Sequence, residues 1–397
     1  MLLELYKMRA RSPVMNTLIL GVLAASLLQP SPSNSQTPAD AIKLDQQGKI
    51  PEAAAAWRAV IKNNPKDAAA FASLGVVLSK EQKYQEAVAA YRKALALNPK
   101  LPGIRLNLGL AEFKLGRFAK AIPPLKAVLS SDPQNVQART LLAFSYYGGG
   151  QFAEASDALT PLAQADPDNT ELHHMLAQSC LWAKRYDCAT QEFRHLLEKD
   201  PHSAAVHILM AQALDGTGKT QEAIEEFRAA ARVSPREPNV HFGLGYLYWK
   251  LQQYDEAKRE FEAELANDPG NAQSLTYLGD IEMKRNNLDA AIALLQKAVQ
   301  LKGDLRLAYL DLGAIYQQQK QYPEALKALQ KAVAIDPSQP DAHYRLGRIY
   351  QAMGKSAEAQ TELAKTRELH EKADEDLVRK MSSSPPSLAG KKGDEQN

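Results

Sequence analysis

Four histidines recur at a fixed interval and are the first side chains to suggest metal chemistry. His173, His207 and His241 are each 34 residues apart, and His343 lies three such intervals further on. A zinc ion holds imidazole nitrogens at about 2 Å. Neighbouring helices lie about 8–10 Å apart, so one ion could hardly collect ligands from three successive helical units. We therefore expect half-buried histidines at the edge of a core, with no metal and no other cofactor.

Cys180 and Cys188 are the chain's two cysteines, and they flank a predicted turn between two helices. In an exported chain such a pair meets an oxidising compartment and can close into a disulfide. A bridge requires Cα atoms within about 7 Å of each other. Two unpaired buried thiols are the alternative.

Glu112 and Glu282 occupy equivalent places in two 34-residue segments, where an apolar residue is usual. Paired carboxylates could do acid–base work. These two are five segments apart and cannot act together, so we interpret them as solvated helix-edge residues. The chain also has no Gly-rich phosphate loop, Gly-x-Ser-x-Gly, His-Glu-x-x-His or Cys-x-x-Cys motif. We predict that the protein is not an enzyme.

A proline every 34 residues organises the chain. The series is Pro65, Pro99, Pro133, Pro167, Pro201, Pro235, Pro269 and Pro337, with Gly303 in the one remaining place. Proline here ends one helix and prepares the next. Counting this proline as residue 32 of each unit divides the chain into ten units without insertion: 34–67, 68–101, 102–135, 136–169, 170–203, 204–237, 238–271, 272–305, 306–339 and 340–373. We number these repeats one to ten.

Small and large apolar residues keep a fixed place inside every repeat. Residue 8 is Gly or Ala, residue 20 is Ala, and residue 24 is large and apolar, such as Trp57 or Phe193. The small residues let two helices approach to about 8 Å, and the large ones fill the space beside that contact. Each repeat is therefore predicted to be two antiparallel helices, A and B.

This pattern resembles the tetratricopeptide repeat (TPR) family, which is small at residues 8 and 20, large at 24 and Pro at 32. The resemblance implies an all-α, right-handed superhelix of about ten helix-turn-helix repeats. We expect the TPR array over residues 36–373, a capping extension of the last helix over 374–381 and a disordered tail over 382–397. In this family residue 4 is an aromatic position, which the four histidines would fill.

Three prolines fall inside predicted B helices. Pro123 and Pro124 are residues 22 and 23 of repeat three, and Pro161 is residue 26 of repeat four. Interior proline removes a backbone hydrogen bond and clashes with the preceding turn. We expect a bend in the array here, with a locally shortened helix as the alternative.

Residues 1–35 have the layout of a secretory signal peptide. Lys7, Arg9 and Arg11 precede an uncharged run over residues 14–28 and a Pro/Ser-rich stretch. We predict a mature N-terminus between residues 25 and 37, and an exported protein, periplasmic or secreted. The alternative is an uncleaved anchor formed by residues 14–28, since about 20 apolar residues span a membrane.

The charge balance argues against a nucleic-acid partner. The chain has 48 basic and 46 acidic residues, and residues 1–35 hold three of the former and one of the latter. The mature chain is therefore neutral and has no global attraction for nucleic acid or an anionic membrane. Its only contact with a membrane would be residues 14–28, if they are not cleaved.

The TPR resemblance implies that A helices line a concave surface, mainly through residues 2, 5, 9, 12 and 13. At these places the chain carries Leu106, Phe113, Phe144, Tyr147, His174, Trp182, Phe242, Tyr246, Trp249 and Tyr344. Aromatic anchors with few charges are typical of a protein-binding surface. We predict that these residues form a binding groove. The alternative is that some of the rings are ordinary core, because periodicity cannot separate the two.

The functional hypothesis is a non-catalytic scaffold of the cell envelope that binds partner proteins or peptides. Residue 5 is never Lys in repeats two to ten, so the Lys/Asn/Arg clamp for a chaperone's C-terminal carboxylate is absent. The alternative hypothesis is a membrane-anchored structural subunit of an envelope assembly, secretion or polysaccharide-export complex.

Overall fold

The computed structural model describes residues 37–383, and this part of the chain forms twenty helices and no strand. The predicted all-α fold of helix-turn-helix repeats is confirmed. The predicted signal segment, its cut sites and the apolar run over residues 14–28 lie outside the described residues, as does the predicted tail from residue 384. Between residues 37 and 383, no helix combines the length and the apolar character needed to cross a membrane.

The described chain divides into two compact units. Unit 1 comprises residues 37–201 and 212–217, and unit 2 comprises residues 202–211 and 218–383. Helix α12 (Ala204–Gly216) is divided between them. The other helices of unit 1 are α2 (Pro38–Gln46), α3 (Ile50–Asn63), α4 (Ala68–Lys80), α5 (Tyr84–Leu97), α6 (Ile104–Lys114), α7 (Phe118–Ser131), α8 (Val136–Gly148), α9 (Phe152–Ala165), α10 (Thr170–Trp182) and α11 (Tyr186–Lys199).

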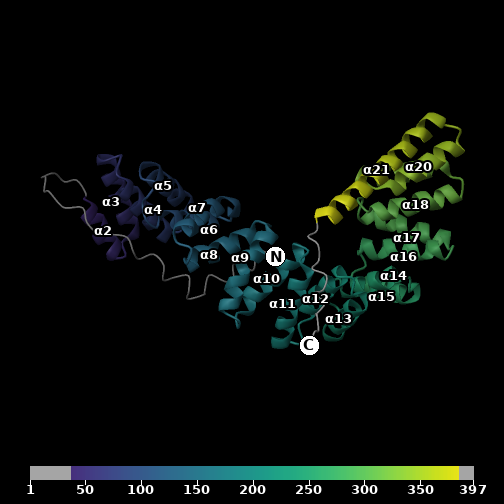
Figure 1. Cartoon of the computed structure of the whole chain (residues 1–397), viewed down its shortest axis with the longest axis horizontal. Coiled ribbons are helices and arrows are strands. Elements are labelled where there is room, and N and C mark those ends of the chain that lie inside the picture. The colour runs from purple at the N-terminus through teal and green to yellow at the C-terminus, as the bar shows by residue number, and fades with distance from the viewer. Residues whose placement is uncertain (1–36, 384–397) are drawn as a thin grey trace, which may run out of the picture. The chain divides into compact units, whose positions relative to one another are not determined.

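Unit 2 continues the alternation of A and B helices. Its remaining helices are α13 (Thr220–Val233), α14 (Val240–Lys250), α15 (Tyr254–Asn267), α16 (Ala272–Lys284), α17 (Leu288–Leu301), α18 (Arg306–Gln318), α19 (Tyr322–Ile335), α20 (Pro340–Ala352) and α21 (Ser356–Ser383). Even-numbered helices are the A helices and odd-numbered helices the B helices. Figure 1 shows them as successive pairs in each unit.

Outside repeat six, each A helix packs on the B helix of its own repeat, and several A helices also pack on the A helix of the next one. The direct A–A contacts are α4 with α6 and α6 with α8 in unit 1, and α14 with α16, α16 with α18 and α18 with α20 in unit 2. The A helices therefore form a layer in each unit, and side chains on that layer can bridge two repeats.

The close approach of helices A and B depends on residue 8 of the repeat. A Cβ added to Gly75 would lie 2.4 Å from the Tyr91 ring, and one added to Gly245 would lie 2.7 Å from the Phe261 ring. Tyr91 and Phe261 are residue 24 of their repeats, and both are fully buried. The small-and-large pattern of the sequence is thus the contact that joins each helix pair.

Turns and caps also repeat with the sequence. Residue 15 of every repeat, from Gly48 to Gly354, has a left-handed backbone that ends helix A and starts the turn. Asn or Asp at residue 34 caps the next A helix in four places, where its side chain accepts a hydrogen bond from a backbone N–H: Asp67, Asn135, Asn169 and Asn271. The ends of the helices are therefore set by residues that lie close to them in the sequence.

The interior prolines do not break their helices. Helix α7 continues through Pro123 and Pro124, and α9 continues through Pro161. Both are 14 residues long, the length of B helices that carry no interior proline, such as α5 and α11. The prolines remove backbone donors without shortening either helix, so the alternative of a shortened helix is wrong.

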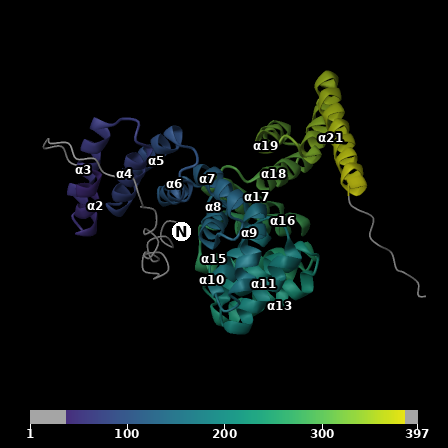
Figure 2. The same ribbon diagram turned by 60° about the vertical axis from the view of Figure 1, so that its left-hand side comes forward.

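The last helix is the longest. Helix α21 has 28 residues and is yellow in Figure 2. Its first part packs on α20. Between residues 371 and 379, the side chains that the structure describes are exposed, except for the half-buried Asp376.

Candidate binding surface

The ten residues predicted for the groove all lie on A helices. Three of them depart from the half-buried state of the other seven. Trp182 on α10 and Tyr344 on α20 are 46% and 50% exposed, and Phe113 on α6 is buried. Phe113 packs edge-to-face on Phe118 at the start of α7, with ring centroids 5.6 Å apart. Phe113 is thus a core residue, as the alternative interpretation of these rings allows.

Unit 1 has an aromatic cluster formed by Tyr147 and Trp182 on the A helices α8 and α10 and by Phe152 at the start of the B helix α9. The Phe152 and Trp182 ring centroids lie 4.6 Å apart, and Tyr147 lies 6.0 Å from Trp182. The Tyr147 hydroxyl donates a hydrogen bond to Gln178 on α10. We call these three rings the unit-1 cluster; its polar contact is between neutral groups.

Unit 2 has a larger cluster, formed by Tyr246 and Trp249 on α14 and Tyr277 on α16. Tyr277 lies 5.0 Å from Trp249 and 5.7 Å from Tyr246, measured between ring centroids. Tyr277 also contacts Phe242 and the buried Phe261, so it links the surface rings to the core. We call Tyr246, Trp249 and Tyr277 the unit-2 cluster.

Charged groups surround the unit-2 cluster. The Trp249 Nε1–H donates to Asp280 Oδ2 at 2.5 Å, and Lys284 pairs with Asp280 Oδ1. The Lys284 ammonium also lies 5.4 Å from the centroid of the Trp249 ring. Asp311, on the adjacent helix α18, is buried, and its Oδ2 has no hydrogen-bond partner.

Burial raises the pKa values of Asp311 and Tyr277. Burial raises the pKa of Asp311 well above its usual value, and the Asp280 carboxylate raises it further. Lys284 and Arg345 act in the opposite direction. Burial, together with Tyr246, Asp280 and Asp311, raises the pKa of Tyr277 to about 12. The A-helix layer of unit 2 thus places aromatic rings beside two buried carboxyl groups.

Sequence reasoning missed Tyr277, Asp280 and Asp311, although a spacing connects them to the predicted residues. Tyr246 to Tyr277, Trp249 to Asp280, and Asp280 to Asp311 are each a step of 31 residues. This step is one 34-residue repeat less about one helical turn, which is where adjacent A helices meet. The same step joins Tyr147 to Gln178 in unit 1.

The periodic histidines form a second regular set of contacts. Each lies on helix A and makes a hydrogen bond with a Glu 19 residues later on helix B, with Nδ1–Oε2 distances of 2.5–2.7 Å. The pairs are His173–Glu192, His207–Glu226, His241–Glu260 and His343–Glu362. In the two pairs of His241 and His343, Nε2 also contacts a proline carbonyl, at 3.1 and 3.3 Å. These contacts join the helices of one repeat and occupy Nδ1 of every periodic histidine.

Residues 37–383 contain no cluster of His, Cys, Asp and Glu able to hold a metal ion. His207 and His241 are half-buried as expected, whereas His173 and His343 are buried. The His195 ring, whose centroid lies 4.3 Å from that of His173, contributes to the burial of His173.

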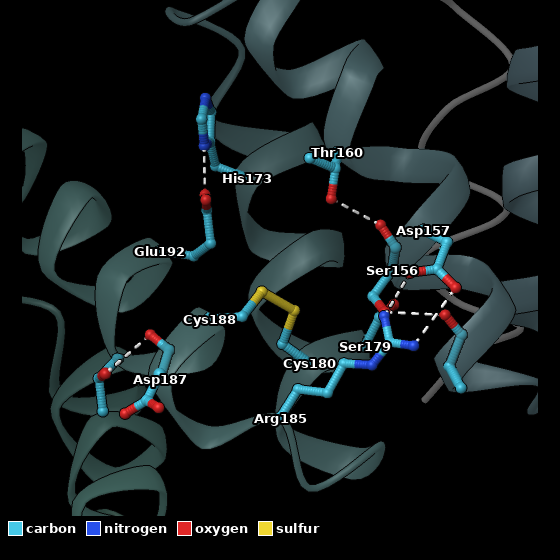
Figure 3. The surroundings of a disulfide bond; sticks show 12 residues. Ser156, Asp157, Thr160, His173, Ser179, Cys180, Arg185, Asp187, Cys188 and Glu192 are labelled. Carbon is cyan, nitrogen blue, oxygen red and sulfur yellow. Dashed lines mark hydrogen bonds and ion pairs between the residues drawn. A yellow bond between two sulfur atoms is a disulfide. The ribbon is translucent and has the colours of Figure 1, made fainter. Parts of the chain in front are cut away.

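Cys180 on α10 and Cys188 on α11 are joined by a disulfide, with Cα atoms 5.8 Å apart. Figure 3 shows the bond near the turn of repeat five and the His173–Glu192 contact further along the same two helices. Arg185, in that turn, reaches Asp157 and Ser156 of α9. Repeat five is therefore held by a covalent and a polar contact between its own helices.

The interpretation of Glu112 and Glu282 as solvated residues is wrong. They are 0% and 7% exposed. Arg92 on the preceding B helix contacts Glu112 at 2.5 Å, and Lys258 on α15 contacts Glu282 at 2.7 Å. Lys258 and Asn287 hold the pKa of Glu282 below its usual value. The two glutamates are buried because residue 11 faces the preceding B helix, which here supplies a cation.

Comparison with solved structures concerns the fold. A chain of the APC/C hetero-tetramer Cut9–Hcn1 has a TM-score of 0.50 and 16% identity, over 83% of this chain and 79% of that one. Yeast Tom70 has a TM-score of 0.41 and 14% identity, over 83% and 91% of the two chains. MamA has a TM-score of 0.37 and 23% identity, over 42% and 97%. No curated protein sequence matches the chain.

Family models match successive segments of the sequence. Models described as TPR repeats or tetratricopeptide repeats match residues 148–213, 208–257, 245–305, 315–354 and 341–372. A model of the cytochrome c-type biogenesis protein H TPR domain matches residues 44–165. Because these matches follow one another from residue 44 to residue 372, over helix pairs that repeat at the family's 34-residue interval, the chain belongs to the tetratricopeptide repeat family.

Proposed function

We propose that this protein is a non-catalytic scaffold that binds segments of partner proteins on the A-helix layer of unit 2. The observation that carries the proposal is the unit-2 cluster, in which Tyr246, Trp249 and Tyr277 gather on two neighbouring A helices and remain only half-buried. Tyr and Trp are enriched at protein interfaces, where they supply most of the binding energy.

A contrast within the chain supports a binding role for these rings. The aromatic side chains at residue 24 of the repeat, such as Tyr91, Phe193 and Phe261, are at most 5% exposed and fill the space between helices. The rings of the unit-2 cluster lie at residues 6, 9 and 12 and keep exposed surface. Packing within a repeat therefore needs the first set, whereas the second set joins neighbouring A helices and keeps exposed surface that a partner can contact.

Position-specific crosslinking in the source cell tests this proposal. A photoreactive p-benzoylphenylalanine replaces Tyr246 on α14, and a control chain carries it at Lys297, an exposed residue on the B helix α17. We expect a discrete crosslinked partner from residue 246 and none from residue 297. Equal crosslinking from both residues, or none from residue 246, would move the binding surface elsewhere.

We also propose that the protein is exported to the cell envelope. The Cys180–Cys188 disulfide supports this location, because structural disulfides persist in oxidising compartments. The signal-like segment over residues 1–35 agrees with it. Fractionation and N-terminal sequencing separate a cleaved, exported chain from a chain anchored by residues 14–28. An intact Met1 in the membrane fraction would favour the anchored subunit.

A role in the maturation of c-type cytochromes is a second candidate function. It is favoured by one observation, the match of residues 44–165 to the TPR domain of a cytochrome c-type biogenesis protein. A gene deletion should then reduce haem-stained c-type cytochromes, and the intact gene should restore them. Normal cytochrome content in the deletion strain would remove this candidate and leave the scaffold proposal standing.

A further inference from the structure

Two carboxylates are buried on neighbouring A helices beside the unit-2 cluster. Asp280 on α16 is 2% exposed, and Asp311 on α18 is 4% exposed. A buried carboxylate is costly unless it is paired and hydrogen-bonded. Each of the two carboxylates therefore needs a cation or a hydrogen-bond donor that stabilises it.

Asp280 has its partners within the protein. Its Oδ2 accepts from the Trp249 indole at 2.5 Å, and its Oδ1 pairs with Lys284. Asp311 has no such arrangement, because its Oδ2 is buried without a hydrogen-bond partner. The ammonium of Lys284 is nearby, but it is already paired with Asp280. The site thus holds two carboxylates and one bonded cation, and the Arg345 guanidinium acts on Asp311 without forming a hydrogen bond to its Oδ2.

The repeat does not require a carboxylate at Asp311. Asp311 is residue 6 of its repeat, and the same place in repeats four to six is Leu141, Met175 and Leu209. An apolar side chain would fill this place at no electrostatic cost. The unpaired acid is therefore a departure from what packing alone demands, and such departures are expected at functional sites.

The rings beside the carboxylates are suited to a cation. Aromatic faces attract a cation within about 6 Å of the ring centroid. Lys284 already places its ammonium 5.4 Å from the centroid of Trp249, so the region accommodates one positive group. Tyr246 and Tyr277 lie next to Trp249 and contact no cation at such a distance in the described chain.

We propose that this site binds a basic side chain, Lys or Arg, of the partner segment, with the cation paired to Asp311 and lying against the ring of Tyr277. The inference rests on the proposed function, since it names the chemistry of the segment that the unit-2 cluster binds. The partner's cation supplies the bonded partner that Asp311 Oδ2 lacks in the isolated protein.

Binding at this site should release a proton from Asp311. The pKa of Asp311 is raised by burial and by Asp280, with Asp341 acting in the same direction, whereas Lys284 and Arg345 lower it. A bound cation favours the ionised carboxyl, so affinity should increase as the pH rises towards that pKa. Tyr277, with a pKa of about 12, stays neutral over this range.

Three peptide probes test the inference on the full chain. They are fluorescein-labelled, leucine-rich nonapeptides that differ only in a central Arg, Lys or norleucine, the last having similar apolar length without charge. We expect the Arg and Lys peptides to bind at least tenfold more tightly than the norleucine peptide in fluorescence anisotropy. Asp311→Asn should remove that difference. Asp304→Asn, at an exposed carboxylate in the same unit, should preserve it.

A stability measurement shows whether any loss of binding in Asp311→Asn results from unfolding. Asn cannot carry the buried negative charge, so Asp311→Asn should unfold at a temperature no lower than that of the wild type. Lost discrimination in a variant that is at least as stable supports the site.

The outcomes separate the two proposals. If all three peptides bind equally well and Trp249→Ala weakens all of them, the cation site is wrong and the aromatic binding surface stands. If the Asp311→Asn variant still prefers the Arg peptide, the cation site is also wrong. If no peptide binds the wild type at millimolar concentration, both proposals fail.

Discussion

Repeats five and seven each present a tryptophan from an A helix, but the surroundings of the two rings differ. Trp182 in repeat five is 46% exposed and packs on Phe152 and Tyr147, with no charged group in the cluster. Trp249 in repeat seven is half-buried, donates to Asp280 and lies under Lys284. The same repeat pattern therefore supports a neutral cluster in unit 1 and a charged one in unit 2.

The two repeats are also held together differently. A His–Glu contact joins helices A and B in both, through His173 in repeat five and His241 in repeat seven. Only repeat five adds a disulfide, between Cys180 and Cys188. Stability in unit 1 thus has a covalent component near Trp182, whereas unit 2 relies on packing and charge.

Replacement of the central ring of each cluster by alanine should give the largest difference in stability between the unit-1 and unit-2 clusters. Tyr277→Ala removes a ring that contacts Tyr246, Trp249, Phe242 and Phe261, so we expect a loss of about 3 kcal/mol in the free energy of unfolding. Trp182→Ala removes an exposed ring and should cost about 1 kcal/mol or less. Urea denaturation followed by circular dichroism measures both. Equal losses would mean that the two clusters are alike.

Reduction of the disulfide should destabilise unit 1 alone. Cys180 and Cys188 close a loop of eight residues, for which chain entropy gives about 2–3 kcal/mol. Hydrogen exchange with and without reductant should show faster exchange in α10 and α11, with α14 and α15 unchanged. A Cys180→Ala/Cys188→Ala variant, which has no bond to reduce, is the control. An equal response in repeat seven would contradict the assignment.

Two matched substitutions compare the hydrogen bonds of the clusters. Trp249→Phe removes an indole N–H that donates to the carboxylate of Asp280, so we expect a loss of about 2 kcal/mol. Tyr147→Phe removes a hydroxyl that donates to the neutral Gln178 and should cost about 1 kcal/mol. Thermal unfolding of each variant against wild type measures the difference. A larger loss for Tyr147→Phe would reverse the comparison.

The pH dependence of stability should have opposite signs at Asp311 and Asp157. The pKa of Asp311 is raised in the folded state, so its contribution is complete below about pH 4 and is lost as the pH rises through the folded pKa. Hydrogen bonding from Arg185 lowers the pKa of Asp157, so that contribution is present above about pH 4 and lost on acidification through the folded pKa.

Asp311→Asn should therefore gain stability relative to wild type as the pH rises from 4 to 8, by about 1 kcal/mol. Asp157→Asn should gain relative to wild type only as the pH falls below 4. Urea midpoints across this pH range test both variants. A relative stability of Asp311→Asn that is independent of pH would show that Asp311 is ionised to the same extent in the folded and unfolded chains.

The sequence predicted the helix pairs because each depends on contacts inside one 34-residue repeat. Gly75 faces Tyr91 within repeat two, and the cap at Asp67 acts on the helix that follows it directly. Such contacts recur at one spacing, so a single count along the chain finds all of them. The same reasoning placed the ten candidate residues on A helices.

Contacts between repeats were harder to predict, because they follow different spacings. Residue 11 meets the preceding B helix at a step of about 20 residues, so Glu112 is buried against Arg92, although the sequence predicts a solvated helix edge for residue 11. The A–A step of 31 residues brings Tyr277 and Asp280 to Trp249. Neither step is visible in a pattern that compares equivalent residues of each repeat.

The sequence by itself therefore determined the TPR family, the A and B helices and the face that carries the candidate aromatic residues. Those features are local and periodic, and hydrophobic size at residues 8, 20 and 24 suffices to specify them. Only the tertiary structure decided which of these rings are exposed, that Glu112 and Glu282 are buried, and that Asp311 lacks a partner. Burial and pairing depend on how the side chains of two adjacent repeats interlock, and a repeat pattern specifies the helices of that contact without specifying which charges meet across it.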